Sequence, residues 1–141
     1  MAQASVSNIA AAPRRPLASG RGSEVLLFGE GHDPQHADMH VNILNRDSGP
    51  GQYHYHSTSE NMYLVLEGIL EICVEGDRYY LGRDDVAFVP PRVRHRAGTH
   101  PDSPVPARVL EVYAPPHPDF NVVEDPTEVH DRNSLEEVKA R

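Results

Sequence analysis

The residues best suited to chemistry in this sequence are three histidines, His54, His56 and His95. His54 and His56 lie two positions apart in a segment predicted to be a strand, so both imidazoles project from the same face. Around His95, the apolar residues Val93 and Ala97 alternate with arginines, which indicates that His95 points toward the interior with the apolar side chains. Three converging imidazoles inside a β-barrel would suit a borderline metal such as zinc, iron(II) or nickel.

A simpler interpretation is that each histidine is an interior polar group held by hydrogen bonds, because a His-x-His pair also arises by chance in a chain with nine histidines. The third histidine and its interior face favour the metal site. Further candidate ligands are Gln52, which shares the face of the first two histidines, and His40, which shares a face with Asn42. For these residues a hydrogen-bonded role is the stronger expectation.

Short strands are the elements that must position these residues. Apolar runs rich in Val, Ile, Leu and Tyr alternate with turn residues, a pattern typical of an antiparallel sandwich or barrel. The predicted strands are Glu24–Phe28, Met39–Leu44, Tyr53–His56, Asn61–Leu66, Ile69–Val74, Arg78–Leu81, Val86–Val89, Arg92–Ala97 and Arg108–Ala114. The dipeptide Glu67-Gly68 predicts a hairpin between the fourth and fifth of them.

The chain of 141 residues has the length of one domain. Residues 1–22 show no periodicity and are rich in Ala, Ser, Pro and Gly, so a flexible arm is expected there. Residues 23–118 would form the barrel. Residues 119–141 are predicted to be an acidic C-terminal tail, in which Ser134 and Glu137 fit a capping box at the start of a short helix.

Composition narrows the classes of partner. A formal net charge of −8 argues against nucleic acid as a binding partner. A single cysteine excludes an internal disulfide and a cysteine-rich zinc site. The mean hydropathy of −0.54, without a long apolar run, argues against a membrane span. The N-terminus lacks the apolar region of a secretory signal, so a cytoplasmic location is expected. Nucleic acid and membranes are therefore not expected as partners.

Two segments resemble the paired motifs of the cupin superfamily. Residues 53–68 are similar to the first motif, in which a His-x-His pair is followed by an acidic residue and a glycine. Residues 84–95 are similar to the second motif, which ends in histidine. The resemblance covers about residues 39–114, more than half of the chain.

This resemblance implies an all-β, single-domain cupin jelly-roll barrel with a flexible N-terminal arm and a short C-terminal helix. It also implies one divalent metal ion bound by His54, His56 and His95. Zinc is the first candidate for that ion, and iron, nickel and manganese are the alternatives.

The sequence departs from the first motif at its acidic position. Counting back from Gly68, the usual glutamate falls on Asn61, whereas Glu60 lies one residue earlier and on the opposite face of a regular strand. The fourth ligand is therefore Asn61, Glu60 reaching in through a bulge, or water. The predicted hairpin register turns Asn61 inward, so we expect Asn61 to face the metal and Glu60 not to bind it. In the second motif, Asp84 and Arg92 replace two glycines, which affects turns rather than ligation.

A site of three histidines with no assured carboxylate ligand departs from the two-His-one-carboxylate set of many iron oxygenases. Such a site favours Lewis-acid chemistry. The sequence also resembles small zinc cupins that act as cyclases in bacterial aromatic polyketide pathways. That resemblance implies a metal-dependent cyclase or isomerase of specialised metabolism, such as antibiotic biosynthesis, whose partner is a small-molecule substrate. A cavity for its substrate could be lined by Tyr53, Tyr55, Tyr63 and Phe88. The alternatives are an Fe(II)-dependent dioxygenase and a non-catalytic small-molecule-binding cupin; no catalytic residue is assigned.

Jelly-roll sheets leave edge strands that must be covered. We expect the N-terminal arm and Val25–Phe28 to add to the sheet of a second copy, which predicts a homodimer.

Overall fold

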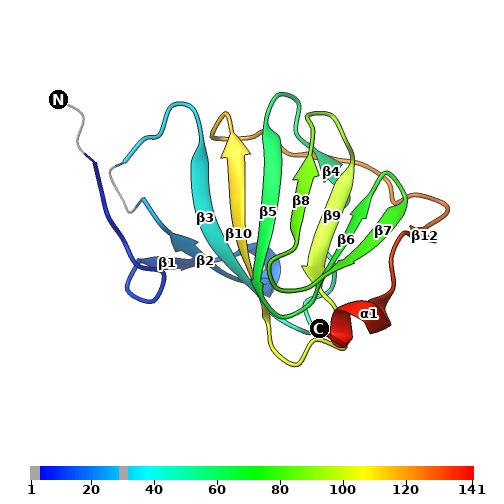
Figure 1. The fold of residues 1–141 in the computed structure, drawn as a ribbon. Coiled ribbons are helices and arrows are strands. Elements are labelled where there is room, and N and C mark those ends of the chain that lie inside the picture. The colour runs from blue at the N-terminus through cyan, green and yellow to red at the C-terminus, as the bar shows by residue number, and fades with distance from the viewer. Residues whose placement is uncertain (1–3, 29–31) are drawn as a thin grey trace.

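The strands of this computed structural model, which describes residues 4–28 and 32–141, form two facing β-sheets (Figure 1). One sheet has the strand order β1-β2-β3-β10-β5-β8 and the other has the order β11-β4-β9-β6-β7-β12. The strands are β1 (Arg14–Pro16), β2 (Gly22–Leu26), β3 (Asp38–Leu44), β4 (His54–Tyr55), β5 (Glu60–Glu67), β6 (Leu70–Val74), β7 (Asp77–Leu81), β8 (Val86–Val89), β9 (His95–Thr99), β10 (Ala107–Ala114), β11 (Asn121–Val122) and β12 (His130–Asp131). The predicted all-β jelly-roll barrel is confirmed.

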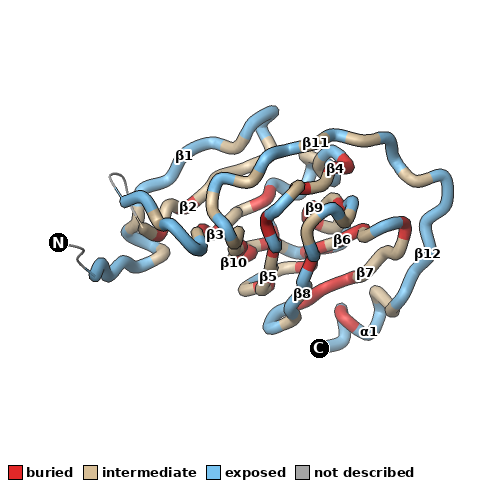
Figure 2. Tube along the Cα trace, turned by 90° about the horizontal axis from the view of Figure 1, so that it is seen from above, coloured by how far each residue is buried: buried red, intermediate tan, exposed pale blue. Residues whose placement is uncertain are grey.

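Inward-facing side chains from the strands of both sheets fill the space between the sheets. In β5, Tyr63 and Val65 are buried while Met62 and Leu64 are only partly buried, as period-2 alternation requires. Figure 2 shows that the buried residues lie mostly on the strands of both sheets, interspersed with partly buried and exposed ones. The main core contains Leu44, Tyr63, Val65, Leu70, Ile72, Leu81, Val89, Ala107 and Val109. Each buried aliphatic side chain stabilises the fold by about 1.5–3 kcal/mol.

Part of the N-terminal segment lies against the first sheet, although no strand was expected within residues 1–22, and the flexibility of this arm stays a prediction. Strand β1 pairs with β2, and Ile9 packs against Val25 and Val41. These contacts join residues far apart in the sequence, which a search for local periodicity does not detect. Because β2 is paired on both sides, Val25–Phe28 is not the free edge that we expected, and the homodimer stays a prediction.

The predicted hairpin at Gly68 is also wrong. Strand β5 belongs to the first sheet and β6 to the second, so the chain crosses between sheets at this glycine. Gly68 has a φ of +81°, and a Cβ atom there would lie 3.0 Å from both Ala107 Cα and Ser103 Oγ. The tight hairpin instead joins β6 to β7 through Glu75 and Gly76, which both have positive φ, as a two-residue turn requires.

The two glycine positions of the second motif keep a glycine-like backbone. Asp84 and Arg92 have φ values of +72° and +67°, in the left-handed region. The turn at Arg92 delays the next strand, so β9 begins at His95 and not at residue 92 as predicted. The Arg92 amide donates a hydrogen bond to the carbonyl oxygen of His56 (2.7 Å), which ties this turn to the histidine pair.

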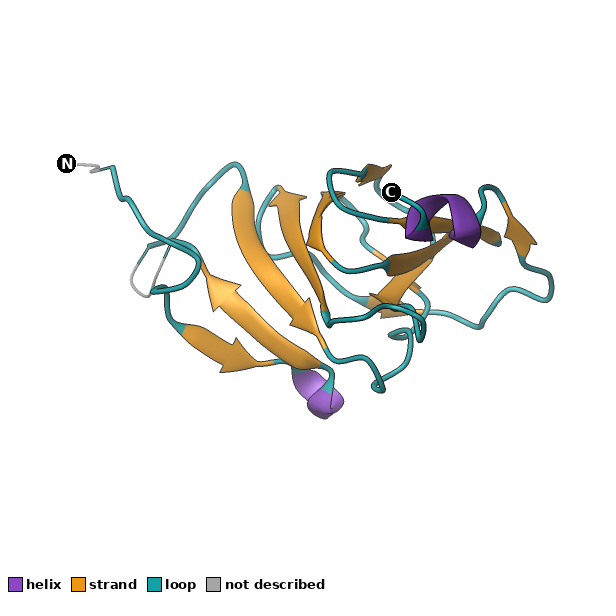
Figure 3. Ribbon diagram, turned by 60° about the horizontal axis from the view of Figure 1, so that its bottom comes forward, coloured by secondary structure: helices purple, strands orange, loops and turns teal. Residues whose placement is uncertain are grey.

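The C-terminal segment adds two strands to the second sheet, β11 and β12, which the sequence analysis did not expect. A short helix, α1 (Leu135–Lys139), begins after the predicted cap Ser134, whose hydroxyl accepts the Glu137 amide. Val138 of this helix is buried against Ile69 and Tyr80, and Figure 3 shows the helix lying beside the second sheet. Among the described residues, no helix is long and apolar enough to cross a membrane.

Candidate metal centre

Three buried histidines meet at one end of the barrel interior. His54 and His95 are paired directly across β4 and β9, and His56 follows two residues after His54. The ring centroids lie 4.4 Å apart for His54 and His95, 4.9 Å for His54 and His56, and 5.3 Å for His56 and His95. One ring nitrogen from each histidine lies within 4.8 Å of the other two. The structure therefore brings together the three residues that the sequence singled out.

Each of the three rings is held by a backbone carbonyl at its Nδ1 atom. The acceptors are the carbonyl oxygens of Gln52 for His54 (2.7 Å), Asp119 for His56 (2.7 Å) and Val93 for His95 (2.9 Å). A carbonyl oxygen only accepts hydrogen bonds, so these contacts are satisfied when the one proton of a neutral ring is on Nδ1, which leaves the lone pair on Nε2. Three lone pairs are therefore directed into the barrel, which is the arrangement that a metal-binding histidine set needs.

The lowered pKa values of two of these rings favour the binding of a cation. Burial lowers the pKa of His54 to about 4, although the hydrogen bond to the Gln52 carbonyl opposes this shift. Burial likewise lowers the pKa of His95. At neutral pH both rings are therefore uncharged and able to bind a metal. The Nε2 atom of His56 is buried without a hydrogen-bond partner, and a bound cation would satisfy it.

The Asn61 side chain is completely buried beside the histidines, and Glu60 is exposed on the other face of β5. Asn61 Oδ1 lies 3.2 Å from His95 Nε2 and accepts the Tyr63 hydroxyl (2.7 Å). Both nitrogens of His95 face an acceptor oxygen, and the contact at Nδ1 (2.9 Å to Val93) is shorter than the one at Nε2 (3.2 Å to Asn61). With the single proton of the neutral ring on Nδ1, the Nε2 lone pair faces the lone pairs of the Asn61 oxygen. A cation between them would resolve this contact between two acceptors.

A segment that the sequence placed in the C-terminal tail completes the site. The carboxylate of Asp119 accepts hydrogen bonds from the Ser57 amide (2.7 Å) and hydroxyl (2.5 Å), and these bonds lower the pKa of Asp119 to about 2. Asp119 is thereby anchored where its backbone carbonyl holds His56. The next residue, Phe120, stacks on His54 with ring centroids 3.8 Å apart. No local signal in this Pro-rich, acidic stretch indicates either contact.

A second buried group that sequence analysis missed is Glu111 on β10. Its Oε1 accepts a hydrogen bond from Asn61 Nδ2 (3.1 Å), its Oε2 accepts one from Asn42 Nδ2 (2.5 Å), and His40 Nε2 lies 3.5 Å from Oε2. Burial by itself would raise the pKa of Glu111, but hydrogen bonding and the charge of His40 outweigh it and lower the pKa to about 2. Glu111 is therefore an ionised carboxylate inside the barrel.

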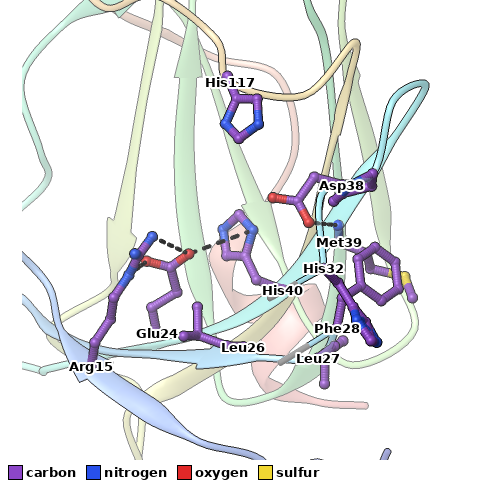
Figure 4. Close-up of a pocket in the computed structure, with 11 residues that line it drawn as sticks. Arg15, Glu24, Leu26, Leu27, Phe28, His32, Asp38, Met39, His40 and His117 are labelled. Carbon is purple, nitrogen blue, oxygen red and sulfur yellow. Dashed lines mark hydrogen bonds and ion pairs between the residues drawn. The ribbon is translucent and has the colours of Figure 1, made fainter. Parts of the chain in front are cut away.

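His40 also forms one wall of a cavity of about 380 Å³ between β1, β2 and β3. Figure 4 shows His40 between the Arg15–Glu24 ion pair and Asp38, with His117 across the space. The His40 ring stacks on Tyr113 (5.6 Å between centroids), and Tyr113 packs edge-on against His56 (5.3 Å). The rings of His40 and Tyr113 therefore lie between the cavity and His56.

The family follows from a comparison with protein-family models. The model of the cupin domain matches residues 41–113, which is just over half of the chain and includes all three histidines. The chain belongs to the cupin family. A comparison with curated proteins finds no match.

Solved cupin structures share the fold at low sequence identity. The polyketide cyclase RemF from Streptomyces resistomycificus has a TM-score of 0.71 and 16% identity, with 89% of each chain covered. KdgF from Halomonas sp. has a TM-score of 0.69 and 16% identity, covering 82% of this chain and 96% of its own. The nucleoside dehydratase Pac13, also known from Streptomyces with uridine, has a TM-score of 0.66 and 15% identity, covering 87% and 92%. Enzymes are thus among the structural neighbours of this cupin.

Other predicted residues of this cupin lie outside the histidine cluster. Gln52 has an exposed side chain and contributes its carbonyl oxygen instead, and His40 is held by Glu111, so neither joins the cluster. Tyr53 is buried, with its hydroxyl accepting the Gly76 amide, so it fills space in the fold. Phe88 lies on the outer face of β8 and is 54% exposed, because the inward positions of that strand are Ala87 and Val89.

Proposed function

We propose that His54, His56 and His95 bind one divalent metal ion, with zinc as the first candidate, and that this cupin is an enzyme acting on a small organic molecule. Our best assignment is carbonyl activation in a cyclase of the aromatic polyketide type. The observation that carries the metal site is the buried, unpartnered Nε2 of His56 beside two further Nε2 lone pairs. Imidazole nitrogen is a ligand that suits zinc.

The nature of the ligands favours a Lewis-acid role. Imidazole and amide groups are neutral ligands when they bind a metal, so a divalent ion held by the three histidines and Asn61 would keep most of its positive charge. When bound, such an ion would polarise a substrate carbonyl and stabilise the enolate needed for aldol closure. Chain residues would bind and orient the substrate: Phe120 offers a half-exposed aromatic face on His54, and Tyr113 lies against His56.

The cavity beside His40 would hold the part of the substrate that extends away from the histidines. Its volume of about 380 Å³ lies in the range of small-molecule sites. Apolar walls from Leu26 and Met39 combine there with the polar groups of Arg15 and Asp38. Such walls suit a molecule that carries several carbonyl or hydroxyl groups on a carbon skeleton.

Metal analysis is the first test of this proposal. Protein purified without added metal is assayed for zinc, iron, nickel and manganese, and we expect about one zinc ion per chain. Iron, together with oxygen consumption in the presence of substrate, would support the dioxygenase instead. A protein that binds no divalent metal would overturn the proposal.

The reaction is tested with a synthetic poly-β-ketone thioester whose uncatalysed aldol closure gives a mixture of aromatic rings. We expect the metal-loaded protein to accelerate closure and to favour one product, and the His95→Gln variant to lose both effects. Binding of the thioester without any change in rate or product would identify a non-catalytic cupin.

A further inference from the structure

Glu111 is a buried carboxylate whose cost to the fold calls for an explanation. It is only 4% exposed, and burying an ion is expensive even when it is paired. Its two oxygens divide their partners: Oε1 accepts from Asn61, whereas Oε2 faces Asn42 and His40. A well-packed apolar residue at this position of the barrel would be cheaper than this network.

The contact with Asn61 fixes the direction of the amide. Asn61 Nδ2 donates to Glu111 Oε1 (3.1 Å) and to the carbonyl oxygen of Val112 (3.2 Å). If the amide turned over, its oxygen would meet these two acceptors, and its NH2 group would replace the oxygen that accepts the Tyr63 hydroxyl. A carboxylate has only acceptor oxygens, so it permits one orientation of its neighbour. In that orientation Oδ1 points at His95 Nε2.

We infer that Glu111 is a positioning residue of the metal centre, which acts by holding the Asn61 amide oxygen toward the Nε2 atoms of the histidines. The inference rests on the proposed metal site. Many iron-binding sites use a carboxylate as a direct ligand. Here the carboxylate of Glu111 lies behind the neutral amide of Asn61, which faces the histidines. Groups that orient ligands from behind usually change metal affinity about tenfold to 100-fold when they are replaced.

The experiment measures Zn²⁺ affinity by competition with a chromophoric chelator, and the absorption spectrum of the Co²⁺-loaded protein, for the full chain and its variants. We expect Glu111→Gln, which can present its own NH2 group to Asn61, to weaken Zn²⁺ binding about tenfold and to change the Co²⁺ spectrum. The matched control is Asn42→Ala, which removes a hydrogen bond from the other oxygen of Glu111 and should leave both measurements nearly unchanged.

A double-mutant cycle separates positioning from a purely structural role. If Glu111 acts through Asn61, adding Glu111→Gln to Asn61→Ala will produce no further loss of Zn²⁺ affinity. An equal loss in both backgrounds, or no loss in the single variant, would overturn the inference. If Glu111→Gln does not fold, Glu111→Asp, which withdraws the carboxylate by one methylene, is measured in its place with the same expectation. Failure of the unaltered protein to bind Zn²⁺ or Co²⁺ would refute the metal site itself.

Discussion

His54 and His95 are direct partners across the antiparallel strands β4 and β9, and their imidazole centroids lie 4.4 Å apart. A single backbone pairing therefore joins the first and last histidines of the candidate site. His56 reaches the same side of the barrel because it lies two residues beyond His54. The geometry of the site thus depends on strand register more than on the conformation of any one loop.

Replacing any one of His54, His56 or His95 by Ala should abolish stable metal occupancy without unfolding the barrel, because the main core consists of other residues. Metal content after gel filtration and the far-ultraviolet circular dichroism spectrum check both parts. His36→Ala is the control, since His36 is exposed and should not affect the metal. A triad variant that retains a full metal complement would remove that histidine from the ligand set.

Glu60 and Asn61 should respond in opposite ways to substitution. Glu60→Gln changes an exposed side chain and should leave metal content nearly unchanged. Asn61→Leu should lower metal content and activity, and it should destabilise the fold by about 1–3 kcal/mol because Glu111 loses a buried donor. Loss of the metal from Glu60→Gln would instead indicate a site with three histidines and one glutamate.

The Glu111–His40 pair should stabilise the metal-free protein within a limited pH window. The pKa of Glu111 falls from 4.5 to about 2 in the fold, so its contribution is present above pH 4.5 and is lost as the pH falls toward 2. Burial alone would lower the pKa of His40, but Glu111 and Glu24 raise it above 6.5. Its contribution is therefore complete below pH 6.5 and is lost as the pH rises through that raised pKa.

The pH window is measured as the difference in Tm between the unaltered protein and His40→Gln at a series of pH values. The difference should be largest between about pH 4.5 and 6.5 and should shrink on both sides. Subtracting the variant removes the shared contribution of His54, whose lowered pKa makes stability rise with pH over part of the same range. A Tm difference that does not vary with pH would show that the pair is not ionised.

Arg92→Gly should stabilise the protein, which is unusual for a substitution by glycine. Arg92 is exposed and has a φ of +67°, so glycine would remove the strain of a left-handed arginine at some cost in chain entropy, a net gain of ~0.5–1 kcal/mol. Arg83→Gly is the control, since Arg83 is exposed in a turn without positive φ and should lose stability. Urea unfolding of the three proteins checks this, and a less stable Arg92→Gly would contradict it.

The parts of the site that were predictable from sequence follow strand alternation. The inward faces of His54, His56 and His95 follow from period 2, and the structure buries all three. Asn61 also faces inward, but the hairpin used to argue it does not exist. Its register comes instead from pairing with Tyr113 of β10 and Val89 of β8.

The parts that were not predictable depend on contacts between distant positions. Glu111 is separated from Asn61 by fifty positions, and Asp119 from His56 by sixty-three. Neither contact leaves a periodic trace in the local sequence. The ordering of Arg14–Pro16 has the same origin, because it depends on pairing with β2 and not on local propensity.

The hydrogen bond between His56 and the Asp119 carbonyl affects when the site can form during synthesis on the ribosome. All three histidines have been synthesised once residue 95 is added, yet the His56 ring lacks its backbone anchor until Asp119 emerges and β11 closes against β4. A nascent chain that stops short of this point carries the complete set of imidazoles with one of them free to rotate. Metal captured before that moment would meet a looser set of donors than the finished barrel presents.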